Sequence, residues 1–183
     1  TYIIDLSLSV EDIWKRLADV RRNDISKGIN DGLQVMKIED NKIVRSLALK
    51  TYYRQKKKAD EICIDRILFN FANRDNSFAF ATYRDGIPIA CSFCIFDNYA
   101  SYYLISGYDD ENKHHGAGPL SVWESIKYSS RLGLKCFDFE GSMIPQIERY
   151  FRGFGGQLTP YYRINKATLP LEMLMKLWRR DLF

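Results

Sequence analysis

The sequence of 183 residues predicts one α/β (α+β) domain with a mixed central sheet flanked by helices. Strand-like and helix-like segments alternate along the chain, and helices stand on both sides of a run of three strands. Asp85-Gly86 lies between two apolar runs, which is typical of a tight hairpin. The composition, 46% hydrophobic and 14% aromatic, is that of a folded chain with a sizeable core.

Hydrophobic periodicity and turn residues assign the elements in order. Helical spacing of apolar residues predicts six helices, over Ser9–Gly28 with Ser9 as its cap, Ile43–Lys58, Ile62–Phe71, Pro119–Leu132, Pro145–Gly153 and Leu169–Asp181. Alternating or continuous apolar runs predict strands over Tyr2–Leu6, Leu33–Ile38, Phe78–Arg84, Ile87–Phe96, Ser101–Tyr108, Lys135–Phe139 and Leu158–Ile164. Gly133 is expected to end the helix before it.

Charge and cysteine usage restrict the partners and the compartment. The net charge of +4 is compatible with phosphate-bearing partners. Cys91 and Cys94 lie three apart on a predicted strand and so face opposite sides, which argues against a shared metal; we expect no metal site. All four cysteines are expected to be buried, reduced thiols of a cytoplasmic protein. No apolar run approaches the length of a membrane span, and the missing initiator Met at Thr1 suggests a fragment.

The stretch 135–156 combines a buried strand, a loop, a short helix and a glycine-rich exit. Asp138 and Glu140 share one face of the strand, while Phe137 and Phe139 share the other. These two carboxylates are candidates for orienting an amine or taking its proton. A structural salt bridge to an arginine is the alternative.

This stretch resembles the Fem family of peptidoglycan bridge-forming aminoacyltransferases. Residues 137–141, Phe-Asp-Phe-Glu-Gly, fit the strand end of that family. Residues 151–155, Phe-Arg-Gly-Phe-Gly, fit its C-terminal motif with one residue fewer between Arg152 and the Phe-Gly pair. The order of elements is also that of the acetyltransferase (GNAT) fold, two lobes of which occur in tandem in Fem proteins. The resemblance therefore implies a second GNAT-like lobe over residues 1–165, and a C-terminal helix over 166–183 that docks on an N-terminal lobe.

The resemblance assigns roles to three side chains. Arg152 stands where the family ordinarily has a Lys that stabilises the oxyanion of acyl transfer. Phe151 and Arg54 are implied in substrate binding, with Arg54 near the phosphates of a nucleotide- or lipid-linked substrate. A surface ion pair between Arg152 and Glu148 is the alternative for the first. For Arg54 and its basic neighbours, the alternative is a solvated helix end.

A glycine-containing loop precedes the helix at Pro119. In acetyltransferases a Gln or Arg, two residues, Gly-x-Gly and a helix hold the coenzyme A pyrophosphate. Here Lys113, Gly116 and Gly118 occupy those positions, which makes them candidate cofactor-binding residues. An ordinary Gly-Pro loop is the alternative. His114 and His115 lie between them as a candidate base or as solvated bystanders.

We expect an enzyme of the acyltransferase class. The leading hypothesis is transfer of an aminoacyl group from aminoacyl-tRNA to an amine of a cell-envelope (peptidoglycan) precursor, with no tightly bound cofactor. The alternative is an N-acyltransferase that uses a coenzyme A thioester as donor, and a further alternative is a non-catalytic binding lobe of a larger enzyme.

Overall fold

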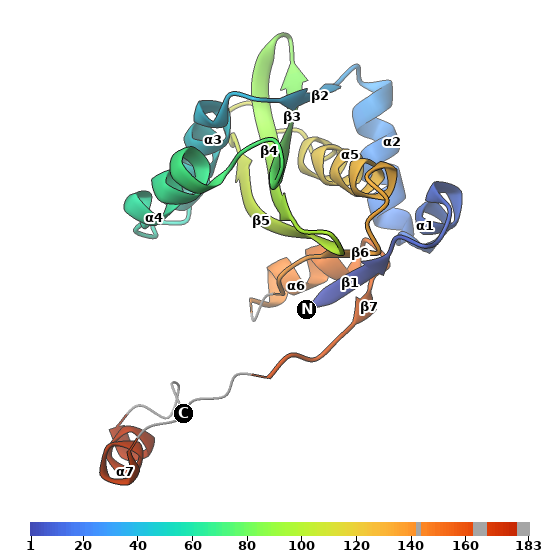
Figure 1. The fold of residues 1–183 in the computed structure, drawn as a ribbon. Coiled ribbons are helices and arrows are strands. Elements are labelled where there is room, and N and C mark those ends of the chain that lie inside the picture. The colour runs from blue at the N-terminus through green and yellow to red at the C-terminus, as the bar shows by residue number, and fades with distance from the viewer. Residues whose placement is uncertain (142–143, 163–167, 179–183) are drawn as a thin grey trace.

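The computed structural model describes residues 1–141, 144–162 and 168–178. Its centre is a seven-stranded sheet in the order β2-β3-β4-β5-β6-β1-β7 (Figure 1). Neighbouring strands are antiparallel except β5 and β6, which are parallel. The strands are β1 (Tyr2–Asp5), β2 (Gln34–Ile38), β3 (Ser77–Arg84), β4 (Ile87–Phe96), β5 (Ala100–Tyr108), β6 (Cys136–Asp138) and β7 (Gln157–Leu158). The predicted mixed sheet flanked by helices is confirmed.

Helices cover both faces of this sheet and bury a core on each (Figure 1). The helices that do so are α1 (Val10–Arg16), α2 (Asp19–Asn30), α3 (Asn41–Arg54), α4 (Glu61–Asp65), a π-helical turn η1 (Arg66–Phe71), α5 (Ala117–Arg131) and α6 (Pro145–Arg152). A further helix, α7 (Leu169–Trp178), contributes none of its described side chains to either core. Helices α1, α2, α5 and α6 pack on one face, and α3, α4 and η1 on the other. Cys94 belongs to the first core and Cys91 to the second, so the two thiols face opposite sides as predicted.

The first predicted helix is two helices, so the prediction of one continuous helix over Ser9–Gly28 is wrong. Ser9 does cap α1 by accepting a hydrogen bond from the Asp12 N–H at 3.1 Å. Leu17 is then extended, with ψ of 140°, and Ala18 donates its N–H to the Gly153 carbonyl at 2.9 Å. This long-range hydrogen bond turns the chain, because it takes the N–H that would have continued the helix.

Two other boundaries and the burial of one cysteine differ from prediction. Helix α3 ends at Arg54 rather than Lys58, and Lys56 beyond it has φ of 52°. The last strand covers only Gln157–Leu158; residues 159–162 lie outside any strand, and 163–164 lie outside the described residues. Cys63 is exposed rather than buried, because it lies on the outer side of the short α4.

The hairpin between β3 and β4 forms as predicted. Asp85 and Gly86 have φ of 51° and 77°, the pair of positive values that a type I′ turn requires. Gly133, with φ of 77°, follows α5 as its expected C′ residue.

The terminal helix α7 carries an apolar stripe that is exposed. Leu171, Leu174, Leu177 and Trp178 keep from half to four-fifths of their surface in contact with solvent. This agrees with the expectation that the stripe does not pack within the core of the preceding residues. Docking of the helix on another lobe stays a prediction.

Candidate functional site

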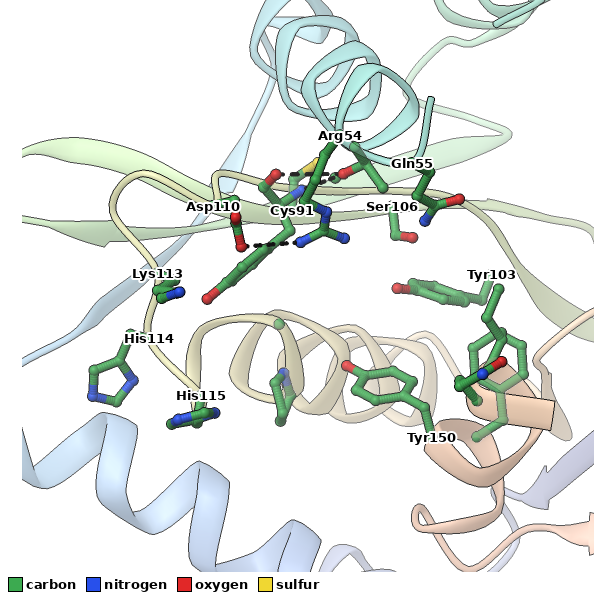
Figure 2. A pocket seen from close by; sticks show the side chains of 18 residues that line it. Arg54, Gln55, Cys91, Tyr103, Ser106, Asp110, Lys113, His114, His115 and Tyr150 are labelled. Carbon is green, nitrogen blue, oxygen red and sulfur yellow. Dashed lines mark hydrogen bonds and ion pairs between the residues drawn. The ribbon is translucent and has the colours of Figure 1, made fainter. Parts of the chain in front are cut away.

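The candidate site lies where the two parallel strands part. Strand β6 pairs with β5 only from Ala100 to Tyr102, whereas β5 continues to Tyr108. Among the described strands, none pairs with that edge of β5 beyond Tyr102. Helix α6 and the first turn of α5 close the opening and leave a cavity of about 580 Å³, which we call the main cavity. Figure 2 shows its side chains converging from β5, α3, α5 and α6.

A β-bulge shapes β5 at this opening. Phe93 of β4 opposes Ile105, but the next residue, Cys94, opposes Tyr103, so Leu104 is an extra residue in β5. Further along β5, the Tyr108 N–H donates to Thr51 Oγ1 at 2.9 Å and therefore points away from β4. Because N–H directions alternate along an antiparallel strand, the Ser106 N–H points the same way, into the opening.

A basic group of side chains forms the outer end of the main cavity. Arg54 from α3, and Lys113 and His115 from the loop before α5, line this end (Figure 2). Arg54 Nη1 lies 3.4 Å from Asp110 Oδ1, and its guanidinium stacks at 5.6 Å over the Tyr108 ring. These cations beside the start of α5 favour an anionic ligand group, such as a phosphate.

Buried Asp109 fixes the loop that carries this basic group. Its carboxylate accepts hydrogen bonds from Lys50 Nζ at 2.7 Å, from the Glu111 N–H at 3.1 Å and from Asn112 Nδ2 at 3.3 Å. The hydrogen bond from Lys50 is the main reason that the pKa of Asp109 is lowered. The loop is thus attached to α3 before it reaches Lys113.

His114 fastens the far end of the same loop. Its Nδ1 accepts the Gly116 N–H at 3.0 Å, and its Nε2 lies 3.0 Å from Asp31 Oδ2. Because Nδ1 accepts, the proton of a neutral ring sits on Nε2, where it is donated to Asp31. His114 is therefore engaged in holding the loop rather than in taking a proton from a ligand.

Gly116 and Gly118 have different surroundings. Gly116 is buried against α2: a Cβ there would overlap the Asp24 carbonyl oxygen and lie 2.8 Å from Gly28 Cα. Gly118 lines the main cavity, and a Cβ there would lie in ordinary contact, 3.4 Å, with the Tyr150 hydroxyl oxygen. A side chain at Gly116 is therefore excluded by the packing of α2, whichever donor the protein uses.

Two tyrosines form the inner end of the main cavity. Tyr103 of β5 and Tyr150 of α6 direct their hydroxyls toward its middle (Figure 2). Burial raises the pKa of both, so both remain protonated at neutral pH. The Arg21 guanidinium of α2 stacks under the Tyr150 ring at 4.3 Å and donates from Nη2 to the Tyr150 carbonyl at 3.4 Å. Cys91 also reaches this cavity, and burial raises its pKa to about 12, which makes it a poor nucleophile.

The structure brings four of the predicted site residues together. Arg54, Lys113, Gly118 and Phe151 all line the main cavity. Gly116 lies behind its wall, against α2.

Three other predicted residues lie outside the walls of this cavity. Arg152 is 60% exposed, and its Nε lies 3.7 Å from Glu148 Oε1, as the surface-pair alternative predicts. Asp138 accepts hydrogen bonds from the Thr1 hydroxyl and, at 2.8 Å, from the Glu140 N–H. The pKa of Glu140 is raised by partial desolvation and by the neighbouring Asp138 carboxylate. Their catalytic roles stay predictions.

Sequence reasoning missed Tyr103, Tyr150 and Ser106. By helical spacing Tyr150 falls on the apolar side of its helix together with Ile147, Phe151 and Phe154, and it does pack against the core. Its hydroxyl group could have indicated the site, because a buried tyrosine usually has a hydrogen-bond partner or access to solvent for its hydroxyl.

Among residues 1–141, 144–162 and 168–178, no three metal-ligating side chains gather at one point. The described helices include none that is long and apolar enough to cross a membrane.

The comparisons with known proteins show the family to which the chain belongs. Residues 49–152 match the family model of the acetyltransferase (GNAT) domain, so the chain belongs to that family. No curated protein matches the sequence at a significant level. The main cavity and the parted strands both fall largely within the matched residues.

Solved structures share the fold at low sequence identity. The structure of FemX superposes with a TM-score of 0.76 at 12% identity, over 86% of this chain and 58% of FemX. The C-terminal domain of a putative lysylphosphatidylglycerol synthetase from Agrobacterium fabrum gives 0.63 at 12%, over 85% of this chain and 56% of that one. A predicted acetyltransferase from Clostridium acetobutylicum, solved with acetyl-CoA, gives 0.59 at 11%, over 73% and 96%. The chain thus spans somewhat more than half the length of the first two.

Proposed function

We propose that this acyltransferase takes its acyl group from a coenzyme A thioester and passes it to an amine. The observation that carries the proposal is the main cavity itself, which has the cations Arg54 and Lys113 at one end and two protonated tyrosines at the other, with Gly118 beside the Tyr150 hydroxyl. A donor with a phosphate head and a reactive carbonyl at its far end matches this polarity. Lys113 and Arg54 would hold the phosphates.

The inner end supplies groups suited to the chemical step. The amine attacks the carbonyl carbon, and the carbonyl electron pair moves onto oxygen, where the Ser106 N–H is directed to stabilise it. The carbon–sulfur bond then breaks, and the departing sulfur takes the proton of the Tyr150 hydroxyl. The new amide nitrogen gives up its proton, and Tyr150 is reprotonated through solvent, so the products are the amide and the free thiol.

Variants at Gly118 test the donor. Gly118→Ala adds a Cβ in ordinary contact and should bind coenzyme A as the wild type does. Gly118→Asp sets a carboxylate against the phosphates; two charges about 4 Å apart repel by about 4 kcal/mol near a protein surface, so binding should weaken at least tenfold. Isothermal titration of both variants with coenzyme A measures this. Equal affinity of the two variants, or no binding to the wild type, would contradict the proposal.

Aminoacyl-tRNA is the second candidate donor, with a cell-envelope precursor as acceptor. Two observations favour it: the superposition on FemX, and the exposed basic run Lys56–Lys58 that begins two residues after Arg54. Such a run suits a nucleic-acid backbone, and binding should fall steeply with salt concentration. Replacing the three lysines by Ala should weaken tRNA binding and leave coenzyme A binding unchanged, because none of the three lines the main cavity. A titration in which the variant binds tRNA as the wild type does would remove this candidate.

The exposed stripe of α7 also belongs to the proposal. We infer that it docks on a further lobe of the whole protein, as the resemblance to tandem-lobed Fem proteins implies. In a protein made of residues 1–183 alone, Leu174→Asp should leave the melting temperature unchanged, because the Leu174 side chain is 53% exposed. The same change in the whole protein should lower it. An equal effect in both would contradict docking.

A further inference from the structure

A second cavity lies next to the main one. It has a volume of about 250 Å³ and lies between the end of α3, β5 and the start of α6. We call it the side cavity. It shares Thr51, Gln55, Ser106 and Ile147 with the main cavity, so the two are adjacent along the parted edge of β5.

The walls of the side cavity differ in chemistry from the inner end of the main cavity. Four elements contribute aliphatic side chains to it, namely Ile64, Leu104, Ile105, Ile144 and Ile147. Lys57 is the one charged residue among its described lining residues, and no carboxylate is among them. A wall of this kind suits an uncharged hydrocarbon group and offers nothing to hold an ammonium ion.

Its apolar walls are unusually open to solvent. Leu104 and Ile144 are 38% and 40% exposed, although they come from β5 and from the segment before α6. Leu104 is turned outward because it is the extra residue of the bulge. Single exposed aliphatic residues are ordinary, but several that meet at a hollow beside a reaction site are typical of a ligand contact.

We propose that the side cavity holds the aliphatic chain of the transferred acyl group, so that the preferred donors carry chains longer than acetyl. The inference rests on the proposed acyl transfer. The reacting carbonyl remains at the hydroxyl-lined end near Tyr103 and Tyr150, and the chain turns off beside Ser106. With about 30 Å³ for each water-sized group, the volume is on the order of eight such groups, enough for a short chain.

Ile144→Asp is the variant that tests this inference. It places a carboxylate in the hydrocarbon wall without removing a side chain of the main cavity. It should also fold, because Ile144 is the N-cap residue of α6 and Asp is a preferred N-cap. Leu132→Asp is the matched control, since Leu132 is likewise 40% exposed and lines neither cavity. Leu104→Ser is a second variant in the same wall.

The measurement is the affinity of each protein for coenzyme A and for its acetyl, butyryl and hexanoyl thioesters. In the wild type and Leu132→Asp, affinity should rise about fourfold for each methylene group buried. In Ile144→Asp and Leu104→Ser the rise should shrink or vanish, while coenzyme A and acetyl-CoA bind as before. Wild-type affinity that does not rise with chain length, or an undiminished rise in both variants, overturns the inference and leaves the proposed function standing.

The same titrations also distinguish failure of this inference from failure of the proposed coenzyme A donor. If neither coenzyme A nor acetyl-CoA binds the wild type, the coenzyme A donor is wrong. The same four proteins are then titrated with 3′-aminoacyl-adenosines that carry alanine or leucine. Tighter binding of the leucyl ester, lost in Ile144→Asp, supports the side cavity as an aliphatic subsite; equal binding of the two esters overturns it.

Discussion

Replacing Tyr150 with Phe should remove the proton donor while leaving the cavity intact. The ring of Tyr150 contacts the Arg21 guanidinium at 4.3 Å and the Phe154 ring at 5.4 Å. Phe preserves the ring, so we expect the free energy of unfolding to change by less than about 1 kcal/mol. Loss of a positioned general acid costs on the order of 100-fold to 10,000-fold in rate. Because burial raises the Tyr150 pKa above its usual value of about 10, the wild type should retain this acid throughout the neutral range.

The assay follows release of the free thiol at saturating amine. Tyr150→Phe should lower kcat at least 100-fold and change KM little, because the hydroxyl acts on the departing sulfur rather than on binding. An aryl thioester, whose thiolate leaves without protonation, should recover much of the loss. Tyr99→Phe is the control, since that side chain is 63% exposed and outside the cavity walls. Wild-type kcat in Tyr150→Phe, or an equal loss with the aryl thioester, would refute the assigned role.

Three further predictions concern packing, pH and the Fem-like motif. Gly116→Ala should lower the free energy of unfolding by about 1–3 kcal/mol in a urea melt, because its Cβ would press on α2; a neutral effect would contradict the packing described. Asp109→Asn should cost about 1–3 kcal/mol at pH 7. The pKa of Asp109 is lower in the folded protein than in the unfolded chain, so its carboxylate stabilises the fold above the unfolded pKa of about 4, and this stabilisation is lost as pH falls through the folded pKa. The free energies of unfolding of the wild type and Asp109→Asn should therefore converge in acid. A difference that stays constant with pH would exclude the ion pair as its source. If Arg152 stabilises an oxyanion, Arg152→Ala should lose about 100-fold in turnover when it is measured in the two-lobed enzyme. Its free energy of unfolding should stay within about 1 kcal/mol of the wild-type value, and Arg152→Lys should remain active. Normal turnover of the Ala variant would make Arg152 a surface residue.

Local patterns predicted most of the sheet and helices because they depend on side-chain periodicity alone. The hairpin at Asp85-Gly86 and the opposite faces of Cys91 and Cys94 follow from rules that act within one element. The break between α1 and α2 could not be predicted in this way. Leu17 and Ala18 are good helix formers, and the hydrogen bond that separates the helices comes from Gly153, far along the chain.

The candidate site was predictable only in part, for a related reason. Charges and glycines pointed to Arg54, Lys113 and Gly118, whose chemistry is visible in the residue type. Periodicity does not distinguish Gly116 from Gly118, although one packs on α2 and the other faces the cavity. Tyr103 lies on strand β5, and it reaches the site because β5 and β6 stop pairing near it. The point at which the two strands separate is set by tertiary packing, which the sequence pattern does not show.

Helix α2 packs against residues at two places along the wall of the main cavity, on the side that faces away from it. Arg21 stacks under Tyr150 at the reacting end, and Gly28 meets Gly116 below the phosphate-suited loop. These two contacts are separated by about two turns, roughly 10 Å at about 1.5 Å per residue. A helix does not stretch, so α2 acts as a spacer of fixed length between the loop at Gly116 and the ring of Tyr150, the two groups to which the proposed function assigns donor binding and proton donation. Inserting one residue between Arg21 and Gly28 would rotate one contact by about 100° relative to the other. The length of this helix is therefore expected to be constrained even where its exposed residues are free to vary.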